Sequence, residues 1–226
     1  EKALAEAFPK ELVAVVNGGG TVSDAFCRLA FDKMIFTGST AVGKTVMAAA
    51  AENLVPVILE LGGKSPVLVH PSIDLRDVAQ RIAVGKLWNA GQTCVAPDYM
   101  FLPRGKTAEF IDHFKACVES MYPDISHNQD YTSIINDKQY NRLQGYLDDA
   151  REQGAQIIEI NPRNESPADL RKIAPTIVTN VMPSMQIMQH EIFGPLLPIM
   201  EYDQIDDVID FINSRPRPLA LYYFDF

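Results

Sequence analysis

The sequence predicts an α/β fold built around a parallel sheet. Short apolar runs alternate with longer helical patterns along most of the 226 residues, and this strand–helix–strand rhythm predicts parallel pairing with right-handed crossovers. A hydrophobic content of 47% and a charged content of 22% are those of an ordinary globular protein. The length is sufficient for one large domain or two small ones.

The first part of the chain contains four short apolar runs that end in turns or glycines. They predict strands over residues 11–17, 33–37, 56–60 and 66–69. The stretches between and after them have helical patterns and predict helices over residues 21–30, 44–53 and 74–88.

The second part repeats this style with longer helices, which are predicted over residues 104–121, 137–153 and 204–214. Cys117 lies on the apolar side of the first of these and is predicted to be a core residue. Strands are predicted over residues 99–102, 156–159, 174–179, 196–200 and 220–226, and a polar surface loop over residues 161–171. The chain starts within this pattern and stops on an apolar strand, so we expect a fragment of a longer protein.

The charge and the polar residues exclude several classes of function. A net charge of -9 and a pI near 4.9 argue against nucleic acid or an anionic membrane as the main partner. No run reaches the roughly 18 apolar residues of a membrane helix. Three cysteines and four scattered histidines have neither disulfide-scaffold nor zinc-site spacing, so we expect no metal site and a reducing, cytoplasmic location.

The segment Asn89-Ala-Gly-Gln-Thr-Cys94 links a predicted helix to a predicted buried strand. Asn89, Ala90 and Gly91 can leave helical geometry at little cost. A thiol on such a tight loop is held in place and stays reachable, which suits a nucleophile. The alternative is that Cys94 is a small core residue, as free cysteines commonly are.

A second segment, Gly38-Ser39-Thr40-Ala41-Val42-Gly43, lies between a predicted strand and a predicted helix. Its glycines allow close approach of a ligand, and a helix N-terminus offers free N–H groups to a phosphate. Together with Lys44 and Thr45 the segment also satisfies the P-loop pattern G-x-x-x-x-G-K-T, so a P-loop NTPase is a real alternative.

Two carboxylates lie at predicted strand ends or turns. Glu60 ends an apolar strand before two glycines, where apolar neighbours would raise the pKa of its carboxyl and suit a general base. The alternative for Glu60 is a charged surface turn. Glu191 could hold ribose hydroxyls and Phe193 could support a flat ring, although their segment is also an ordinary Gly-Pro turn before a strand.

Four segments of the chain, in this order along the sequence, resemble motifs of the aldehyde dehydrogenase superfamily. They are residues 36–43 (FTGSTAVG), 59–66 (LELGGKSP), 91–94 (GQTC) and 191–195 (EIFGP). The continuation CVAPDY after Gln92-Thr93 resembles the class 3 branch, including coniferyl-aldehyde-dehydrogenase-like members. The resemblance covers essentially the whole chain and argues against the P-loop alternative.

The resemblance implies a division of the chain and a role for each motif. Residues 1–60 would be the last part of a Rossmann-like NAD(P)-binding domain and residues 61–226 an incomplete parallel-sheet catalytic domain. Cys94 would attack an aldehyde to form a thiohemiacetal and then a thioester, and Glu60 would activate the hydrolytic water. The cofactor, NAD or NADP, would contact Gly38, Ser39, Thr40, Ala41, Val42, Gly43, Leu61, Glu191 and Phe193.

Several expectations depend on the same resemblance. The reaction would convert a small-molecule aldehyde to a carboxylic acid, and the parent protein would be a homodimer or homotetramer. Family members are roughly twice as long as this chain, so the isolated fragment is expected to have little activity. The alternatives are a cysteine-dependent thioesterase or acyltransferase, which would need a histidine partner for its thiol, and an inactive chain that retains only the fold.

Overall fold

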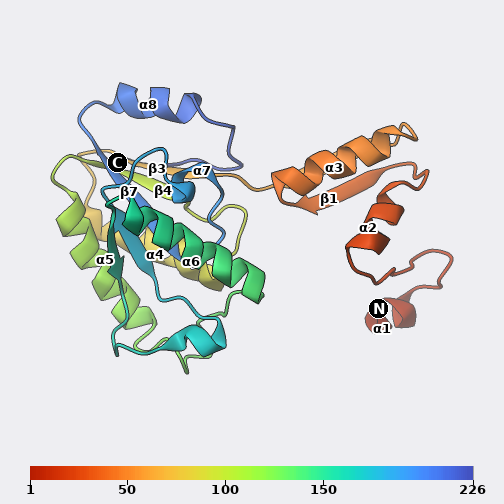
Figure 1. The fold of residues 1–226 in the computed structure, drawn as a ribbon, viewed down its shortest axis with the longest axis horizontal. Coiled ribbons are helices and arrows are strands. Elements are labelled where there is room, and N and C mark those ends of the chain that lie inside the picture. Colours follow the sequence, from red (N-terminus) through yellow and green to blue (C-terminus); the bar gives the residue numbers. More distant parts are fainter. Residues whose placement is uncertain (226) are drawn as a thin grey trace. The chain divides into compact units, whose positions relative to one another are not determined.

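The computed structural model describes residues 1–225. The chain divides into two compact units, Glu1–Leu61 and Gly62–Phe226. Figure 1 shows the elements of both units. Among the helices of residues 1–225, none has the length and hydrophobicity that a membrane-spanning helix requires.

The first unit is built on two parallel strands joined by a helix. Strand β1 (Met34–Gly38) pairs in parallel with β2 (Val57–Leu61), and α3 (Thr40–Ala51) forms the crossover and packs on both strands (Figure 1). Helices α1 (Lys2–Ala7) and α2 (Gly20–Cys27) precede this core. These strands and helices confirm the predictions from residue 21 onward within a few residues.

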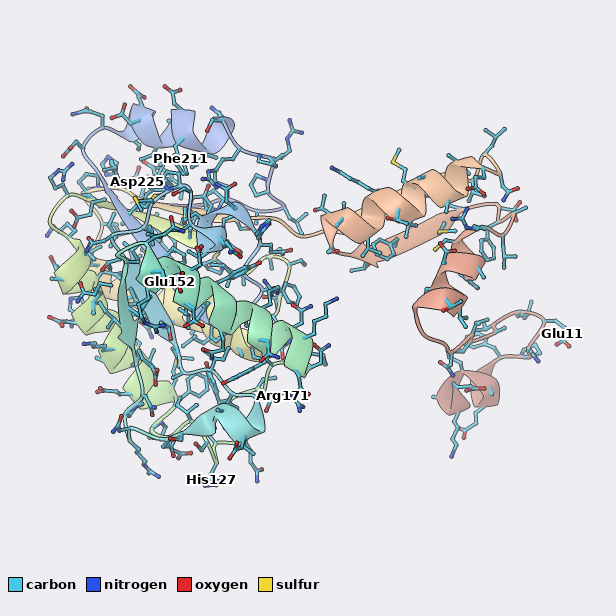
Figure 2. All side chains as sticks on the ribbon, in the orientation of Figure 1. Glu11, His127, Glu152, Arg171, Phe211 and Asp225 are labelled. Atoms are coloured by element: carbon cyan, nitrogen blue, oxygen red, sulfur yellow. The ribbon has the colours of Figure 1, made fainter. Side chains whose placement is uncertain are left out.

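The prediction of a strand over residues 11–17 was wrong. Residues 13–19 have no regular structure, and Figure 2 shows Glu11 on the open loop between α1 and α2. A strand requires a neighbour that accepts and donates its backbone hydrogen bonds, and within residues 1–225 β1 and β2 pair with each other alone. An apolar run without such a neighbour stays irregular.

Helix α3 starts four residues earlier than predicted. The Ser39 hydroxyl accepts a hydrogen bond from the Val42 N–H at 3.4 Å and caps the helix. Gly38 therefore ends β1, Ser39 is the cap, and Thr40–Gly43 form the first turn of the helix. The glycine-rich segment is a strand end and a helix N-terminus, with no loop between them.

The second unit contains a six-stranded sheet in the order β5-β6-β7-β4-β3-β8. The strands are β3 (Pro66–Val69), β4 (Tyr99–Pro103), β5 (Gln156–Glu159), β6 (Thr176–Thr179), β7 (Leu196–Tyr202) and β8 (Tyr222–Phe224). Strands β3, β4, β6, β7 and β8 pair in parallel as predicted. The last strand is shorter than predicted, and Phe226 lies outside the described residues.

Strand β5 departs from the predicted parallel pairing, because it runs antiparallel to β6. The connection between these strands contains only the short turn η2 (Pro167–Leu170), within the segment predicted to be a surface loop. Parallel neighbours need a long crossover, usually a helix. Without that helix the chain reverses and pairs antiparallel.

Five helices accompany this sheet: α4 (Leu75–Leu87), α5 (Thr107–Met121), α6 (Asp137–Glu152), α7 (Gln186–Gln189) and α8 (Ile205–Asn213). Helices α4 and α5 pack together, and their buried apolar faces join β3 and β4 in one continuous core. Cys117 packs against this core and is partly buried, which agrees with its predicted role. Four of these helices match predicted ones; α7 is an additional single turn.

The end of α4 is an unusual turn. After Leu87 the tight turn η1 (Trp88–Gly91) contains three consecutive left-handed residues, with φ of 53° at Asn89, 52° at Ala90 and 73° at Gly91. A Cβ atom on Gly91 would lie 2.3 Å from the Gly194 carbonyl oxygen. Only glycine satisfies both the backbone angle and this close approach.

We expect Gly91→Ala to destabilise a full-length protein that contains the chain by about 2–4 kcal/mol, because left-handed strain and a clash with backbone add together. Gly105→Ala is the matched control, since Gly105 has φ +79° with open space around its Cβ position. The control should lose only about 1 kcal/mol. Urea denaturation midpoints measure both, and equal losses would show that the contact with Gly194 contributes nothing.

Candidate active site

Three of the predicted motif segments meet within the second unit. Gly62 lies so close to Glu191 that a Cβ atom on Gly62 would be 2.0 Å from Glu191 Oε1. The Gly63 N–H donates a hydrogen bond to the same carboxylate. Gly91, on the segment that leads to Cys94, touches Gly194. Residues 62–64, 91–98 and 187–195 therefore pack against one another.

A buried ion pair joins these segments. The Lys64 Nζ binds the Asp98 carboxylate, and the exposed fractions of the two side chains are 11% and 4%. The Lys64 ammonium also donates to the carbonyl oxygens of Ile187 at 2.7 Å and His190 at 3.0 Å. The second oxygen of Asp98 accepts the Ile192 N–H at 2.8 Å. Burial lowers the pKa of the Lys64 ammonium, and the Asp98 charge opposes that shift.

The Glu191 carboxylate is half-buried beside the glycines. Burial raises the pKa of the Glu191 carboxyl above its ordinary value. The Gly63 N–H and the cations of Arg142 and Lys64 act in the opposite direction, and the Asp98 charge adds to the rise. A carboxylate with these partners is held in one position and can accept hydrogen bonds from sugar hydroxyls.

Phe193 has an exposed ring and a left-handed backbone with φ of 49°. Such a φ is a strained conformation for a bulky residue. The flanking backbone is fixed by Arg142, which donates to the carbonyl oxygens of Glu191 at 3.1 Å and Ile192 at 2.7 Å. Backbone strain held by this many contacts is a common feature of ligand sites.

Cys94 is exposed, at the second position of a four-residue turn. The Ala96 N–H closes the turn by donating to the Thr93 carbonyl oxygen at 3.1 Å. Ahead of the turn, the Gln92 side chain donates to the carbonyl oxygens of Asn89 and Ser133, each at 3.1 Å, and accepts the Ile135 N–H at 3.0 Å. The thiol is thus reachable on a loop that is held firmly, as predicted.

The other predicted residues belong to the first unit. In the parallel register Gly38 is opposite Leu61 and Thr37 is opposite Glu60, so these residues share the carboxyl end of the two strands. Leu61 packs on Gly43, where a Cβ atom would lie 2.7 Å from its side chain. The Glu60 side chain is exposed, so the apolar surroundings expected for it are not provided.

A cavity of about 440 Å³ lies between α2, β1 and α3 of the first unit. Its lining is mainly apolar and includes Val22, Phe26, Phe36, Val42 and Val46, with Gly18 at one side. An apolar cavity of this size could receive a flat ring. Val42 lines the cavity and also belongs to the first turn of α3, so the N-terminus of that helix lies next to the cavity. The helix N-terminus could hold an anionic group beside that ring.

Sequence reasoning missed the residues that position the site. Lys64, Asp98 and Gln92 lie inside the quoted motifs but were given no role, and Arg142 was not noticed at all. A lysine directly after two glycines and an aspartate four residues after the cysteine are charged groups beside buried strands. Charged residues are rarely buried unless they are paired, so this placement was an available signal.

Lys86 is a second buried lysine in the same unit, in the last turn of α4 and only 1% exposed. Burial lowers the pKa of the Lys86 ammonium from 10.5 to about 8; the charges of Asp98 and Glu191 raise it, and that of Lys64 lowers it. Burial removes this ammonium from water, and a buried cation destabilises the folded state unless its lost hydration is replaced.

We expect Lys86→Met to stabilise a full-length protein that contains the chain by about 2–3 kcal/mol near pH 7. The unfolded state binds the lysine proton more tightly, so the gain is complete below pH 8. It decreases as the pH rises from 8 toward 10.5, where both states become neutral. Urea denaturation at several pH values measures this dependence.

Lys106→Met is the control for this prediction, because Lys106 is exposed and pairs with Glu109 at 2.8 Å. Its effect should stay within about 0.5 kcal/mol at every pH. A Lys86→Met variant that is less stable at pH 7, or whose gain does not vary with pH, would contradict the expectation.

The chain is similar to known proteins over nearly its whole length. The sequence model of the aldehyde dehydrogenase family matches residues 1–224. A "Probable coniferyl aldehyde dehydrogenase" of Pseudomonas aeruginosa is 52% identical over 223 residues, which are 99% of this chain and 46% of that protein. The chain thus spans about half the length of the curated relatives it matches.

Solved structures have the same fold. The structure described as "Substrate bound state of Staphylococcus Aureus AldH" has a TM-score of 0.91 and 40% identity, covering 99% of this chain and 48% of that one. An NADP-dependent glyceraldehyde-3-phosphate dehydrogenase from Bacillus halodurans C-125, complexed with NADP, has a TM-score of 0.86 and 30% identity, covering 99% and 46%. The match extends over nearly all of the residues, with high identity, so the chain belongs to the aldehyde dehydrogenase family.

Proposed function

We propose that the chain carries the nucleophile and the general base of an enzyme that oxidises an aldehyde to a carboxylic acid with NAD or NADP. The observation that supports this most strongly is the convergence of residues 62–64, 91–98 and 187–195 around an exposed, firmly held Cys94 loop. Because the relatives are about twice as long, the active protein in this proposal is a full-length aldehyde dehydrogenase that contains these residues.

In the proposed reaction the Cys94 sulfur attacks the carbonyl carbon of the aldehyde and forms a carbon–sulfur bond. The negative charge moves to the carbonyl oxygen, and the Cys94 N–H donates a hydrogen bond to it. Among residues 1–225 no acceptor meets this N–H, which leaves it available. Loss of a hydride from the same carbon converts the thiohemiacetal to a thioester.

Glu60 completes the cycle. Its carboxylate removes a proton from a water molecule, whose oxygen attacks the thioester carbon. The carbon–sulfur bond breaks, the carboxylic acid leaves, and Cys94 is regenerated as the thiolate. This role requires Glu60 to approach the thioester, and its position at the end of β2, directly before Leu61 and Gly62, supports it.

The residues of the chain fit a nicotinamide dinucleotide. The bound cofactor supplies the two-electron acceptor of the reaction. The apolar cavity of the first unit fits the adenine ring, and the first turn of α3, Thr40–Gly43 with the Ser39 cap, fits the phosphates. Glu191 would hold the nicotinamide ribose, with Phe193 and Leu61 near the ring. The complex of the Bacillus halodurans relative with NADP supports this class of cofactor.

We extend the proposal to the domain division, the substrate class, the location and the assembly of the full-length enzyme. Residues 1–60 would belong to the cofactor-binding domain and residues 61–226 to the catalytic domain. The coniferyl aldehyde dehydrogenase name of the Pseudomonas relative favours medium or large apolar aldehydes, aromatic ones included. We place the full-length enzyme in the cytoplasm as a homodimer or homotetramer.

The test uses the full-length enzyme, an aromatic aldehyde and each nicotinamide cofactor, with the absorbance of the reduced cofactor as the readout. Cys94→Ala should abolish turnover, because no other group forms the covalent bond. Glu60→Gln should give a burst of reduced cofactor and then almost no steady state, because the thioester accumulates. The 226 residues alone should show little turnover.

Two variants serve as controls. Cys117→Ala changes a thiol that packs against the core, and Glu159→Gln changes an exposed carboxylate at the end of β5; both should retain the burst and the steady state. Turnover by Cys94→Ala would contradict the assignment of Cys94 as the nucleophile. Thioester hydrolysis without aldehyde oxidation would favour a thioesterase instead.

A further inference from the structure

Tyr222 contacts the loop of the candidate nucleophile from β8, which is far from Cys94 in sequence. It lies on β8, opposite Val67 of β3 in the parallel register. Successive residues of a strand point to opposite faces, so Tyr222 and Tyr223 face opposite ways. Tyr222 is partly buried against the core, and its hydroxyl donates a hydrogen bond to the Val95 carbonyl oxygen.

The Val95–Ala96 peptide is consequently held on both sides. Its carbonyl oxygen accepts the Tyr222 hydroxyl, and its N–H donates to the Thr93 carbonyl oxygen at 3.1 Å. The Thr93 carbonyl belongs to the same peptide unit as the Cys94 N–H. Since a peptide unit is planar, fixing its carbonyl oxygen also fixes the direction of that N–H.

These contacts form a continuous chain of hydrogen bonds and peptide planes. It runs from the Tyr222 hydroxyl through the Val95–Ala96 peptide to the Thr93–Cys94 peptide, and it ends at the Cys94 N–H. Within residues 1–225, Tyr222 is the side chain that anchors the turn at its Val95 carbonyl. Hydrogen bonds arranged in sequence polarise one another, so each strengthens the next donor.

We propose that Tyr222 is a positioning residue that orients and polarises the Cys94 N–H toward the negative oxygen of the thiohemiacetal. This inference deepens the proposed function and rests on it, because the oxygen exists only if Cys94 attacks an aldehyde. The Tyr222 hydroxyl bonds the backbone of the loop, at the Val95 carbonyl oxygen, and the proposed effect passes through two peptide units.

Burial and a neighbouring charge keep the Tyr222 hydroxyl protonated, so that it can donate its hydrogen bond. Burial raises the pKa of the Tyr222 phenol above its ordinary value of 10.0, and the charge of Cys94 acts in the same direction. The hydroxyl therefore retains its proton at neutral pH, including when the neighbouring sulfur is a thiolate.

The test compares the full-length enzyme with its Tyr222→Phe variant in two measurements. The first is the rate of the pre-steady-state burst of reduced cofactor, which depends on the negative oxygen. The second is the rate of Cys94 alkylation by iodoacetamide across pH, which depends on the thiolate but forms no such oxygen. We expect the burst rate to fall about tenfold, less than the roughly 10²–10³ of a direct oxyanion donor. KM and the alkylation profile should stay within about twofold.

Two matched controls remove a tyrosine hydroxyl elsewhere in the same unit. Tyr223→Phe changes the neighbour on the opposite face, whose hydroxyl donates to Asp225 at 3.2 Å. Tyr202→Phe removes another phenol that donates to a carbonyl, that of Val69 at 2.7 Å. Both variants should keep the burst rate of the parent enzyme.

A conservative replacement separates hydrogen bonding from packing. 3-Fluorotyrosine at position 222 keeps the ring and donates more strongly, so it should restore the burst rate to at least the parent value. The proposal is overturned if Tyr222→Phe leaves the burst unchanged, if both controls lose as much, or if burst and alkylation fall together, since a joint loss means that the loop has moved. Failure of the proposed function itself appears separately, as turnover by Cys94→Ala.

Discussion

The buried pair of Lys64 and Asp98 is the interaction on which the second unit's site depends. An ammonium removed from water is stable only when its hydrogen bonds are replaced, and Lys64 replaces them with Asp98 and two carbonyl oxygens of residues 187–190. Asp98 in turn holds the Ile192 N–H. Three distant segments are thereby fixed at one point, and the contacts of Gly62 and Gly91 follow from that arrangement.

Backbone strain accompanies this fixed geometry on both sides of the thiol. The left-handed backbones of Asn89, Ala90 and Phe193 are costly conformations, because these residues have side chains. Gln92 and Arg142 hold them through hydrogen bonds to backbone atoms. The loop is therefore held in one conformation before any ligand binds. Preorganisation of this kind reduces the conformational entropy that the loop would lose when it reacts with a bound molecule.

The alternating pattern of apolar runs was sufficient to predict the α/β class, nearly all helices and most strands, because each depends on local periodicity. The error at residues 11–17 and the antiparallel pairing of β5 have another origin: both depend on which neighbour a strand finds, and a local pattern does not contain that information. Cys94 and Glu191 were proposed as site residues from their motifs, which are local in sequence. Lys64, Asp98 and Arg142 were missed, because their partners are far away in sequence.

The register of β8 against β3 brings together two segments of the second unit that are far apart in sequence. The Cys94 turn receives its contact from Tyr222 only after that strand has paired. During synthesis, the cysteine is therefore made long before the residue that completes its surroundings. Any disturbance of the pairing between β3 and β8 would therefore reach the Cys94 loop through the Tyr222 contact, from a strand far away in sequence.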